Sequence, residues 1–272
     1  MSQRSVTFRP AAPTDAPAIV RVIREAFPAR LVGAMIYGCH GVAGFVAEQI
    51  RVQQLGGETC YAVACDGGRV VGCAEMRCQP NRLFLTYIAI QPDYRRQGLG
   101  GRLLHAAIEA AGADAAEFAL DVFDFSDGAR QWYRHLGLEQ RDAFSWWQIA
   151  PTDDAPAPVR LSGYAQAQAC HRDFGFSQFS LTAADTRYEI GRLGDQWYRL
   201  TDASALTVPG LIAAITRLSP QRDVLLVAKT SALDSSPNRA SEIARSQRLA
   251  GPLATVLQRL TEKELERAQG RQ

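Results

Sequence analysis

The chain has 272 residues, of which 47% are hydrophobic and 21% are charged, and its formal net charge is +2. This composition is that of a globular protein and excludes a disordered or fibrous chain, while the length predicts two domains. The near-neutral charge forms no basic stripe of the kind that binds a phosphate backbone, so we expect no nucleic-acid partner.

Neither a leader nor a membrane span is predicted. The opening MSQRSVTFRP lacks the apolar core of a signal peptide, and no run reaches the roughly 18 apolar residues that cross a bilayer. We therefore expect a cytoplasmic protein without membrane contact. The cysteines show no CxxC spacing, which predicts reduced thiols among apolar side chains and no metal site. They are Cys39, Cys60, Cys65, Cys73, Cys78 and Cys170.

Apolar spacing predicts alternating strands and helices over the first 150 residues. In chain order these are a strand at 6–9, a helix at 19–27, a helix at 42–55, strands at 59–65, 69–78 and 83–90, a helix at 99–112, a strand at 118–123, a helix at 128–136 and a strand at 143–149. The strand at 83–90 is apolar on both alternations, which is typical of a central strand. We expect an α/β (α+β) fold with a mixed central sheet flanked by helices.

The segment 151–158, PTDDAPAP, has the composition of a linker. It predicts a boundary between a domain at 1–150 and a smaller α+β domain at 159–272. In the second domain the pattern predicts strands at 174–181, 188–192, 196–201 and 224–228, a helix over 208–218 and a terminal helix over 253–260. This order echoes half of the first domain, as a degenerate copy would.

The segment 93–101, DYRRQGLGG, joins the buried strand to an amphipathic helix. The first amides of a helix have no intrahelical acceptor, and the helix dipole favours an anion there. Glycine at 98 and 100 lets the backbone approach a bulky diphosphate, and two arginines add positive charge. The alternative is a glycine turn that only packs the helix on the strand.

Three motifs in order resemble the GNAT superfamily of N-acetyltransferases over about residues 5–150. Arg95-x-x-Gly98-x-Gly100, after a strand ending in Ile88-Ala89-Ile90-x-Pro92, is similar to the family's motif A. Residues 129–138, with Tyr133 followed by Gly137 and Leu138, resemble motif B. The start Val6-Thr7-Phe8-Arg9-Pro10-Ala11, followed by Asp15, resembles the family's first strand and its lead into helix one.

The resemblance implies acetyl-CoA as co-substrate. The backbone of Ile88, Ala89 and Ile90 would receive the pantetheine arm like an added strand, and the Ile88 amide would stabilise the oxyanion. The amides implied to hold the pyrophosphate are those of Arg95, Arg96, Gln97, Gly98, Leu99, Gly100 and Gly101. Ser126 stands where motif B often has asparagine, seven residues before the tyrosine, which weakens that contact to CoA.

Tyr133 matches the family's general acid, because a phenol can protonate the leaving thiolate; the alternative is an aromatic residue packed in the core. The strand at 83–90 carries Thr86 and Tyr87 where an acidic base often stands. Glu75 on the neighbouring strand is therefore our candidate base, and a salt-bridged carboxylate is the alternative. Asp121 is a weaker candidate for the base.

The sequence thus predicts an acetyl-CoA-dependent N-acetyltransferase that acetylates a primary amine, of a small molecule or a peptide, by direct attack in a ternary complex. The alternatives are a non-catalytic acyl-CoA-binding regulator or interaction protein on the same scaffold, and a nucleotide-binding enzyme of another fold. Tyr37 and His40 could line the acceptor pocket. The acceptor, the role of the second domain and the oligomeric state are not readable from the sequence.

Overall fold

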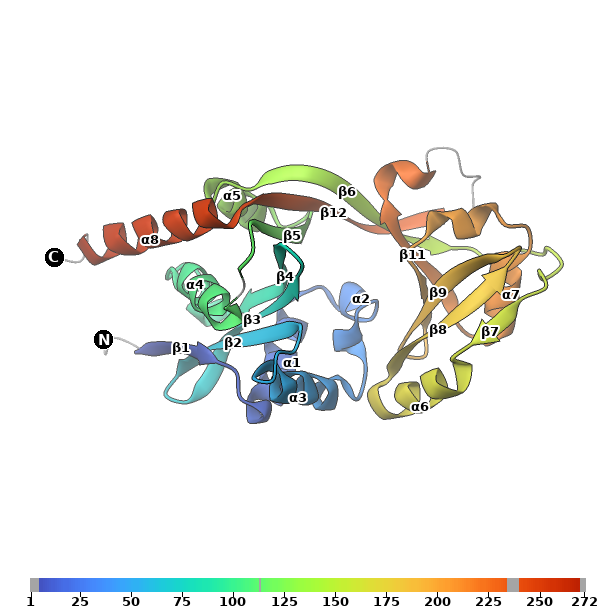
Figure 1. The fold of residues 1–272 in the computed structure, drawn as a ribbon, viewed down its shortest axis with the longest axis horizontal. Coiled ribbons are helices and arrows are strands. Elements are labelled where there is room, and N and C mark those ends of the chain that lie inside the picture. Colours follow the sequence, from blue (N-terminus) through green and yellow to red (C-terminus); the bar gives the residue numbers. More distant parts are fainter. Residues whose placement is uncertain (1–4, 113, 234–239, 270–272) are drawn as a thin grey trace. The chain divides into compact units, whose positions relative to one another are not determined.

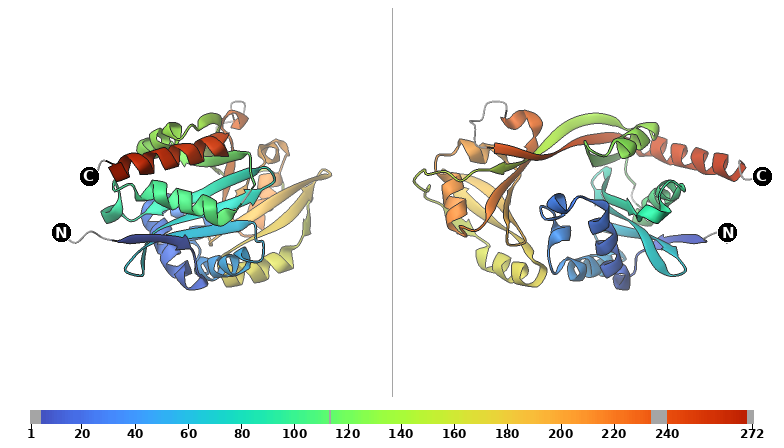
Figure 2. Two further views of the ribbon diagram at one scale, coloured as in Figure 1. Left: turned by 60° about the vertical axis from the view of Figure 1, so that its left-hand side comes forward. Right: turned by 180° about the vertical axis from the view of Figure 1, so that it is seen from behind.

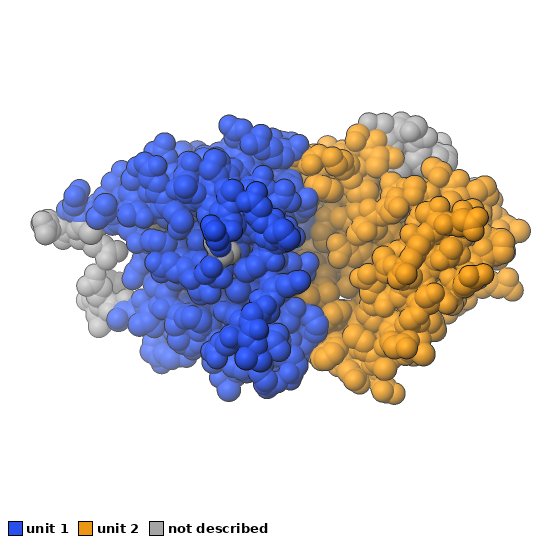
Figure 3. Space-filling model, in the orientation of Figure 1, with its two compact units in different colours: residues 1–28, 43–141, 247–272 blue, residues 29–42, 142–246 orange. Residues whose placement is uncertain are grey.

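The computed structural model describes residues 5–112, 114–233 and 240–269 of the chain (Figure 1). The chain forms two compact units, coloured separately in Figure 3. Unit 1 takes residues 1–28, 43–141 and 247–272, and unit 2 takes residues 29–42 and 142–246.

Unit 1 is a mixed sheet covered by helices. Its strands are β1 (Val6–Pro10), β2 (Thr59–Asp66), β3 (Arg69–Gln79), β4 (Arg82–Ile90), β5 (Glu117–Phe123) and the end of β12 (Ala240–Pro252), in the order β1-β2-β3-β4-β5-β12. Its helices are α1 (Ala16–Ala26), α3 (Val42–Gln53), α4 (Leu99–Ala111), α5 (Asp127–His135) and α8 (Leu253–Gln269). β1 to β4 pair antiparallel, and β4 pairs with β5 parallel.

Local sequence sets the turns of unit 1. Gly67 and Gly68 close the β2–β3 hairpin at φ +55° and +85°, a region that side chains with a Cβ rarely adopt. Gly112 ends α4 at φ +55°, and its amide donates to the Glu109 carbonyl. Gly67 and Gly68 therefore form the hairpin turn, and Gly112 ends α4 where the sequence predicts the end of the helix.

The main core of unit 1 lies between the sheet and α4, α5 and α8. Leu103 and Leu104 of α4 pack there with Val256 and Leu260 of α8, and the two helices run side by side (Figure 2). The opposite face of the sheet carries α1, which packs on β3 and β4. There the Cys73 thiol lies 3.9 Å from the carbonyl oxygen of Ile19.

Unit 2 repeats the order of elements seen in unit 1. Its strands are β7 (Arg160–Ser162), β8 (Phe176–Ala183), β9 (Thr186–Leu193), β10 (Trp197–Leu200), β11 (Asp223–Lys229) and the end of β6 (Glu139–Ile149), in the order β6-β11-β10-β9-β8-β7. Its helices are α2 (Ala29–Val32), α6 (Tyr164–Phe174) and α7 (Leu211–Arg217). As in unit 1, three antiparallel strands lead through a helix to a strand that pairs parallel with the third.

Each unit also takes a strand from the other half of the chain. β12 and α8 come last in the sequence, yet β12 lies beside β5 of unit 1. β6 belongs to the first 150 residues, yet its residues 144–149 pair with β11 of unit 2. The units therefore differ from the expected division at 151–158, because side-by-side strand pairing groups segments that are distant in sequence.

All six cysteines are free thiols. Burial and the nearby Cys78 thiol raise the pKa of Cys60 to about 12, which keeps this thiol protonated. No helix in the described ranges is long and apolar enough to span a bilayer.

Candidate functional site

The parallel strands β4 and β5 separate before they end. Their register runs from Arg82 opposite Glu117 to Leu85 opposite Leu120 and stops there. β4 nevertheless continues to Ile90, paired with β3 on its other side. Residues 86–90 therefore present a strand edge to which an extended molecule can add by backbone hydrogen bonds.

A β-bulge sits where the separation begins. Glu75 pairs with Tyr87 and the next residue, Met76, pairs with Leu85, so Thr86 is the extra residue on β4. A bulge bends the strand and ends regular pairing, which is why such features recur next to functional sites. The Thr86 hydroxyl oxygen is buried and has no hydrogen-bond partner among the described residues.

The loop after β4 is anchored by hydrogen bonds of Tyr94 and has a strained backbone at Arg96. Tyr94 is buried; its hydroxyl donates to Asp66 over 2.6 Å and accepts from Arg69 over 2.9 Å. Arg96 and Gly98 then adopt φ values of +64° and +78°. A positive φ at a residue other than glycine is uncommon, and such strained residues cluster at ligand-binding sites. Arg96 therefore marks this loop as a candidate ligand-binding site.

Helix α4 begins directly after Gly98 with an open first turn. Leu99 is buried, whereas Gly100 and Gly101 are partly exposed, and a Cβ at Gly100 would meet only Trp132, at 3.9 Å. The first-turn amides have no intrahelical acceptor. Arg95, Arg96 and Gln97 are exposed beside them. Together the open strand edge and this cationic helix start fit an extended arm that ends in a diphosphate.

Some loop side chains have partners within the loop. Arg95 Nε donates to the carbonyl of Ile90 over 2.9 Å, and the Gln97 amide donates to the carbonyl of Asp93 over 3.1 Å. The Ile90 carbonyl is one of the groups expected to pair with the pantetheine arm. A bound arm would thus take over a carbonyl that Arg95 now holds, which frees that guanidinium to turn toward the phosphates.

The predicted acid, Tyr133, lies on α5 with its ring 4.8 Å from that of Trp132. It is 5% exposed and packs in the core on the α4 side of the sheet. Burial raises the pKa of the Tyr133 phenol, so the group holds its proton at neutral pH. A general acid must be protonated before the thiolate leaves, and the Tyr133 phenol meets this requirement.

The predicted base, Glu75, lies on the opposite face of the sheet. It is 2% exposed, and its register partners are Tyr61 on β2 and Tyr87 on β4. Directly opposed residues share a face, so Glu75 and Tyr87 point to the α1 side. Asp121, the weaker candidate, forms two hydrogen bonds of 2.9 and 2.8 Å with Arg248, which makes it an ion-pair partner.

The remaining predicted residues are divided between the units. Ser126 is the residue before α5 and is half-buried; its carbonyl accepts from the Arg130 amide at 2.9 Å. Tyr37 is fully buried in unit 2. His40 also lies in unit 2, and its Nε2 is 3.2 Å from the Arg172 carbonyl.

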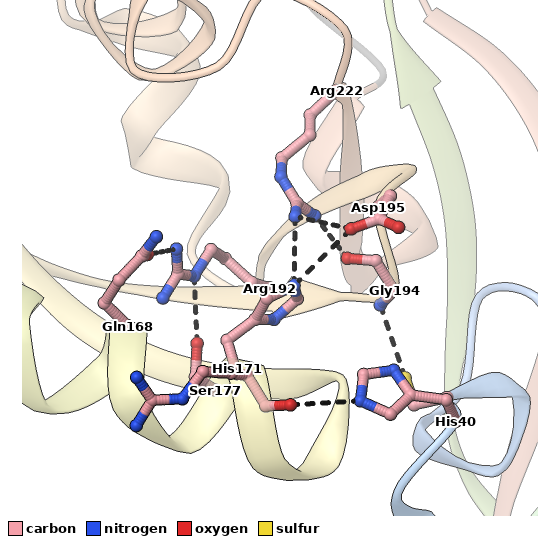
Figure 4. A network of polar contacts seen from close by, with 10 residues as sticks. His40, Gln168, His171, Ser177, Arg192, Gly194, Asp195 and Arg222 are labelled. Carbon is pink, nitrogen blue, oxygen red and sulfur yellow. Dashed lines mark hydrogen bonds and ion pairs between the residues drawn. The ribbon is translucent and has the colours of Figure 1, made fainter.

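A polar network in unit 2 was not anticipated from the sequence (Figure 4). Arg222 contacts the Gly194 carbonyl, Asp195 and His171, and Arg192 donates to Ser177 over 2.9 Å and to Gln168. The Gly194 amide donates to the thiol of Cys39 at 3.3 Å. These contacts connect α6, the β9–β10 turn and residues 29–42. The contact of His40 with the Arg172 carbonyl adds to this connection.

The counterpart of the glycine loop in unit 2 is closed. Gly210, at φ +72°, precedes α7 as Gly98 precedes α4. Here, however, a Cβ at Gly210 would lie 2.1 Å from the Ala155 carbonyl oxygen, and the Ala157 amide donates to the Gly210 carbonyl at 2.9 Å. The chain itself covers this helix start, and β10 ends at Leu200 together with its pairing to β11.

Comparison with known proteins agrees with this architecture. Residues 35–138 match the family model of the acetyltransferase (GNAT) family, which agrees with the resemblance found in the sequence. No curated protein matched the sequence.

Solved structures with the same fold cover nearly the whole chain. A putative acetyltransferase from Pyrococcus horikoshii is 12% identical, covers 93% of this chain and 91% of its own, and has a TM-score of 0.61. A GCN5-related N-acetyltransferase from Sphaerobacter thermophilus is 15% identical, with coverage of 91% and 95% and a TM-score of 0.59. A tandem GNAT protein from the clavulanic acid biosynthesis pathway is 13% identical, with coverage of 91% and 98% and a TM-score of 0.59.

These likenesses define the fold as two GNAT-like halves in one chain. The family match supports acetyl transfer in general. Among residues 5–112, 114–233 and 240–269, no group of three or more histidine, cysteine, aspartate or glutamate side chains is placed to hold a metal ion.

Proposed function

We propose that unit 1 binds acetyl-CoA and transfers its acetyl group to a primary amine by direct attack in a ternary complex. The observation that carries this proposal is the β4 edge beyond Leu85, which opens beside the start of α4. The same elements in unit 2 are shortened and covered, so the geometry favours one acyl-CoA site per chain.

In this proposal the backbone of Ile88 and Ile90 pairs with the pantetheine arm, while Ala89 stays buried between them. The amides at the start of α4 and the guanidiniums of Arg95 and Arg96 hold the diphosphate. Thr86 supplies a hydroxyl that bound substrate can satisfy, which would remove the cost of a buried polar group without a partner.

The acid and the base stand on opposite faces of the sheet, and the base lies at the β-bulge where β4 and β5 separate. The amine nitrogen bonds to the acetyl carbon and loses a proton to Glu75, directly or through water. The Ile88 amide stabilises the oxyanion that forms on the carbonyl. The carbon–sulfur bond then breaks, and the leaving thiolate takes the phenolic proton of Tyr133.

Thiol release with a panel of primary amines tests this proposal. The wild type should release CoA in proportion to acetylated amine. Gly100→Glu should abolish release, because a carboxylate in the first turn of α4 repels the diphosphate. Gly100→Ala tests the backbone approach alone, and it should fold at least as stably, since alanine is favoured over glycine within a helix by about 0.5–1 kcal/mol.

Two outcomes would contradict the proposal in different ways. Tight acetyl-CoA binding without release of CoA in the presence of any amine would favour the alternative, a non-catalytic acyl-CoA-binding protein. Equal release by the wild type and Gly100→Glu would move the site away from α4.

A further inference from the structure

Four aromatic side chains gather where β4 and β5 separate, on the α1 side of the sheet. The ring of Phe27, just after α1, lies 5.9 Å from Tyr87 on β4 and 6.1 Å from Phe123 at the end of β5, both edge to face. Phe125 stacks on Phe123 at 5.2 Å with an interplanar angle of 12°. We call Phe27, Tyr87, Phe123 and Phe125 the ring wall.

The ring wall spans the gap that the strands leave. The last pair between β4 and β5 is Leu85 with Leu120. Tyr87 follows Leu85 by two residues, and Phe123 follows Leu120 by three. Phe27 contacts both, so it bridges the two strands where they no longer pair. The bound thioester of the proposed function would lie in this gap, and the ring wall would be its neighbour on the α1 side.

The ring wall shares its face with the proposed base. Glu75 is the register partner of Tyr87, and opposed residues of an antiparallel pair lie on one face. Tyr133 packs on the other face. An amine that loses its proton to Glu75 must therefore approach along the ring wall.

The ring wall is open at one end. Phe125 is 51% exposed, although phenylalanine is among the residues most often buried. Phe27, Tyr87 and Phe123 are each partly exposed. The pair Phe123 and Phe125 thus offers an apolar surface next to Ser126, the residue before α5.

Charge beside the ring wall argues against a polycationic acceptor. Asp121 is bound by Arg248, and Asp124 accepts from Gln247 at 2.8 Å and lies 3.7 Å from Arg130. Asp121 and Asp124, the carboxylates on either side of Phe123, thus each already lie against an arginine. An aromatic ring, by contrast, pairs well with a second ring or with a single ammonium group.

We propose that the acyl acceptor of this site is a monoamine that carries an aromatic ring, which stacks on Phe123 and Phe125 while its amine faces Glu75. This assignment rests on the proposed function of unit 1. It makes Phe125 the residue that selects the acceptor.

Binding without turnover tests the assignment. With non-acetylated CoA present, calorimetry should show 2-phenylethylamine binding at least about fivefold more tightly than ethanolamine or spermidine, because a stacked ring pair is worth about one kcal/mol beyond buried area. Phe125→Ala should remove about that factor, and Phe125→Trp should keep it. Leu55→Ala is the matched control, since Leu55 is another exposed apolar side chain of unit 1, 83% exposed.

The outcomes separate this assignment from the proposed function. Equal binding of spermidine and 2-phenylethylamine, or equal affinity in wild type and Phe125→Ala, would overturn the aromatic acceptor. If the ring amine binds as expected and Phe125→Ala loses it, yet no amine is acetylated from acetyl-CoA, the ring wall is an aromatic amine-binding site and the proposed acetyl transfer is wrong. Acetylation of ethanolamine with the same kcat/KM as 2-phenylethylamine would overturn the assignment and leave acetyl transfer intact.

Discussion

The two units share one order of strands and helices but differ at the two places where chemistry is expected. In unit 1, β4 runs on to Ile90 after its pairing with β5 has ended, and α4 starts with an open turn. In unit 2, β10 and its pairing end together at Leu200, and residues 155–157 cover the start of α7. Topology is therefore not enough to make this site, and a few residues of strand and loop decide it.

The helices themselves differ in the same sense. α4 has thirteen residues and begins with Leu99, Gly100 and Gly101, whereas α7 has seven residues and begins with the buried pair Leu211 and Ile212. A short helix with an apolar, covered first turn offers little to an anion. Unit 2 instead contains the polar network of Arg192, Arg222 and His171.

The largest expected effect comes from separating the halves. A chain of residues 1–150 lacks β12 and α8, which bury Leu249, Leu253, Val256 and Leu260 in the core of unit 1. Those burials amount to roughly 6–12 kcal/mol, which is comparable to the whole stability of a domain. The fragment should show no cooperative unfolding transition by circular dichroism. A cooperatively folded fragment that binds acetyl-CoA would show that the strand from the second half is dispensable.

The second effect concerns the acid. Tyr133→Phe keeps the buried ring and removes the proton, so kcat should fall about 100-fold. The KM for acetyl-CoA should stay within about threefold, because in the proposal the phenol acts on the leaving group and not on binding. A variant with unchanged kcat would make Tyr133 a core residue only.

The third effect concerns the base and depends on pH. Glu75→Gln should lower kcat about tenfold near neutral pH, where the acceptor ammonium must lose a proton. As the pH rises toward the amine's own pKa of roughly 10, water removes that proton and the variant should approach the wild type. A loss that is the same at every pH would assign Glu75 a structural role.

The smallest effect is confined to unit 2. Burial, followed by the charges of Arg192 and Arg222, lowers the pKa of His171 in the folded protein. The folded state therefore favours the neutral imidazole, so its stability is full above the unfolded pKa of roughly 6.5 and declines as the pH falls below it. Urea unfolding at pH 7.5 and 5.5 should show a smaller pH dependence for His171→Gln. An equal dependence would place the acid-sensitive group elsewhere.

Much of unit 1 could be predicted from the sequence because its signals are local. The continuous apolar run at residues 83–90, the helix end at Gly112 and the apolar face of α4 each depend on neighbours in the chain. The compact units follow long-range strand pairing, for which the sequence has no local signal.

For two of the elements that escaped prediction the reason is visible. In α6, with the sequence YAQAQACHRDF, Ala167 is the one fully buried residue, so helical periodicity is weak. β12 buries Ala244 and Ser246 on one stretch and Leu249 and Ala250 on the next, which breaks the alternation of a half-buried strand. The ring wall was missed because Phe27, Tyr87 and Phe123 are far apart in sequence and meet only where β4 and β5 separate.

The most direct test of the difference between the units is the stoichiometry of acetyl-CoA binding by isothermal titration. We expect one molecule per chain, lost in Gly100→Glu and kept in Arg217→Glu, which places a carboxylate on the exposed last residue of α7 in unit 2. Two molecules per chain, or binding lost in Arg217→Glu and kept in Gly100→Glu, would contradict the account.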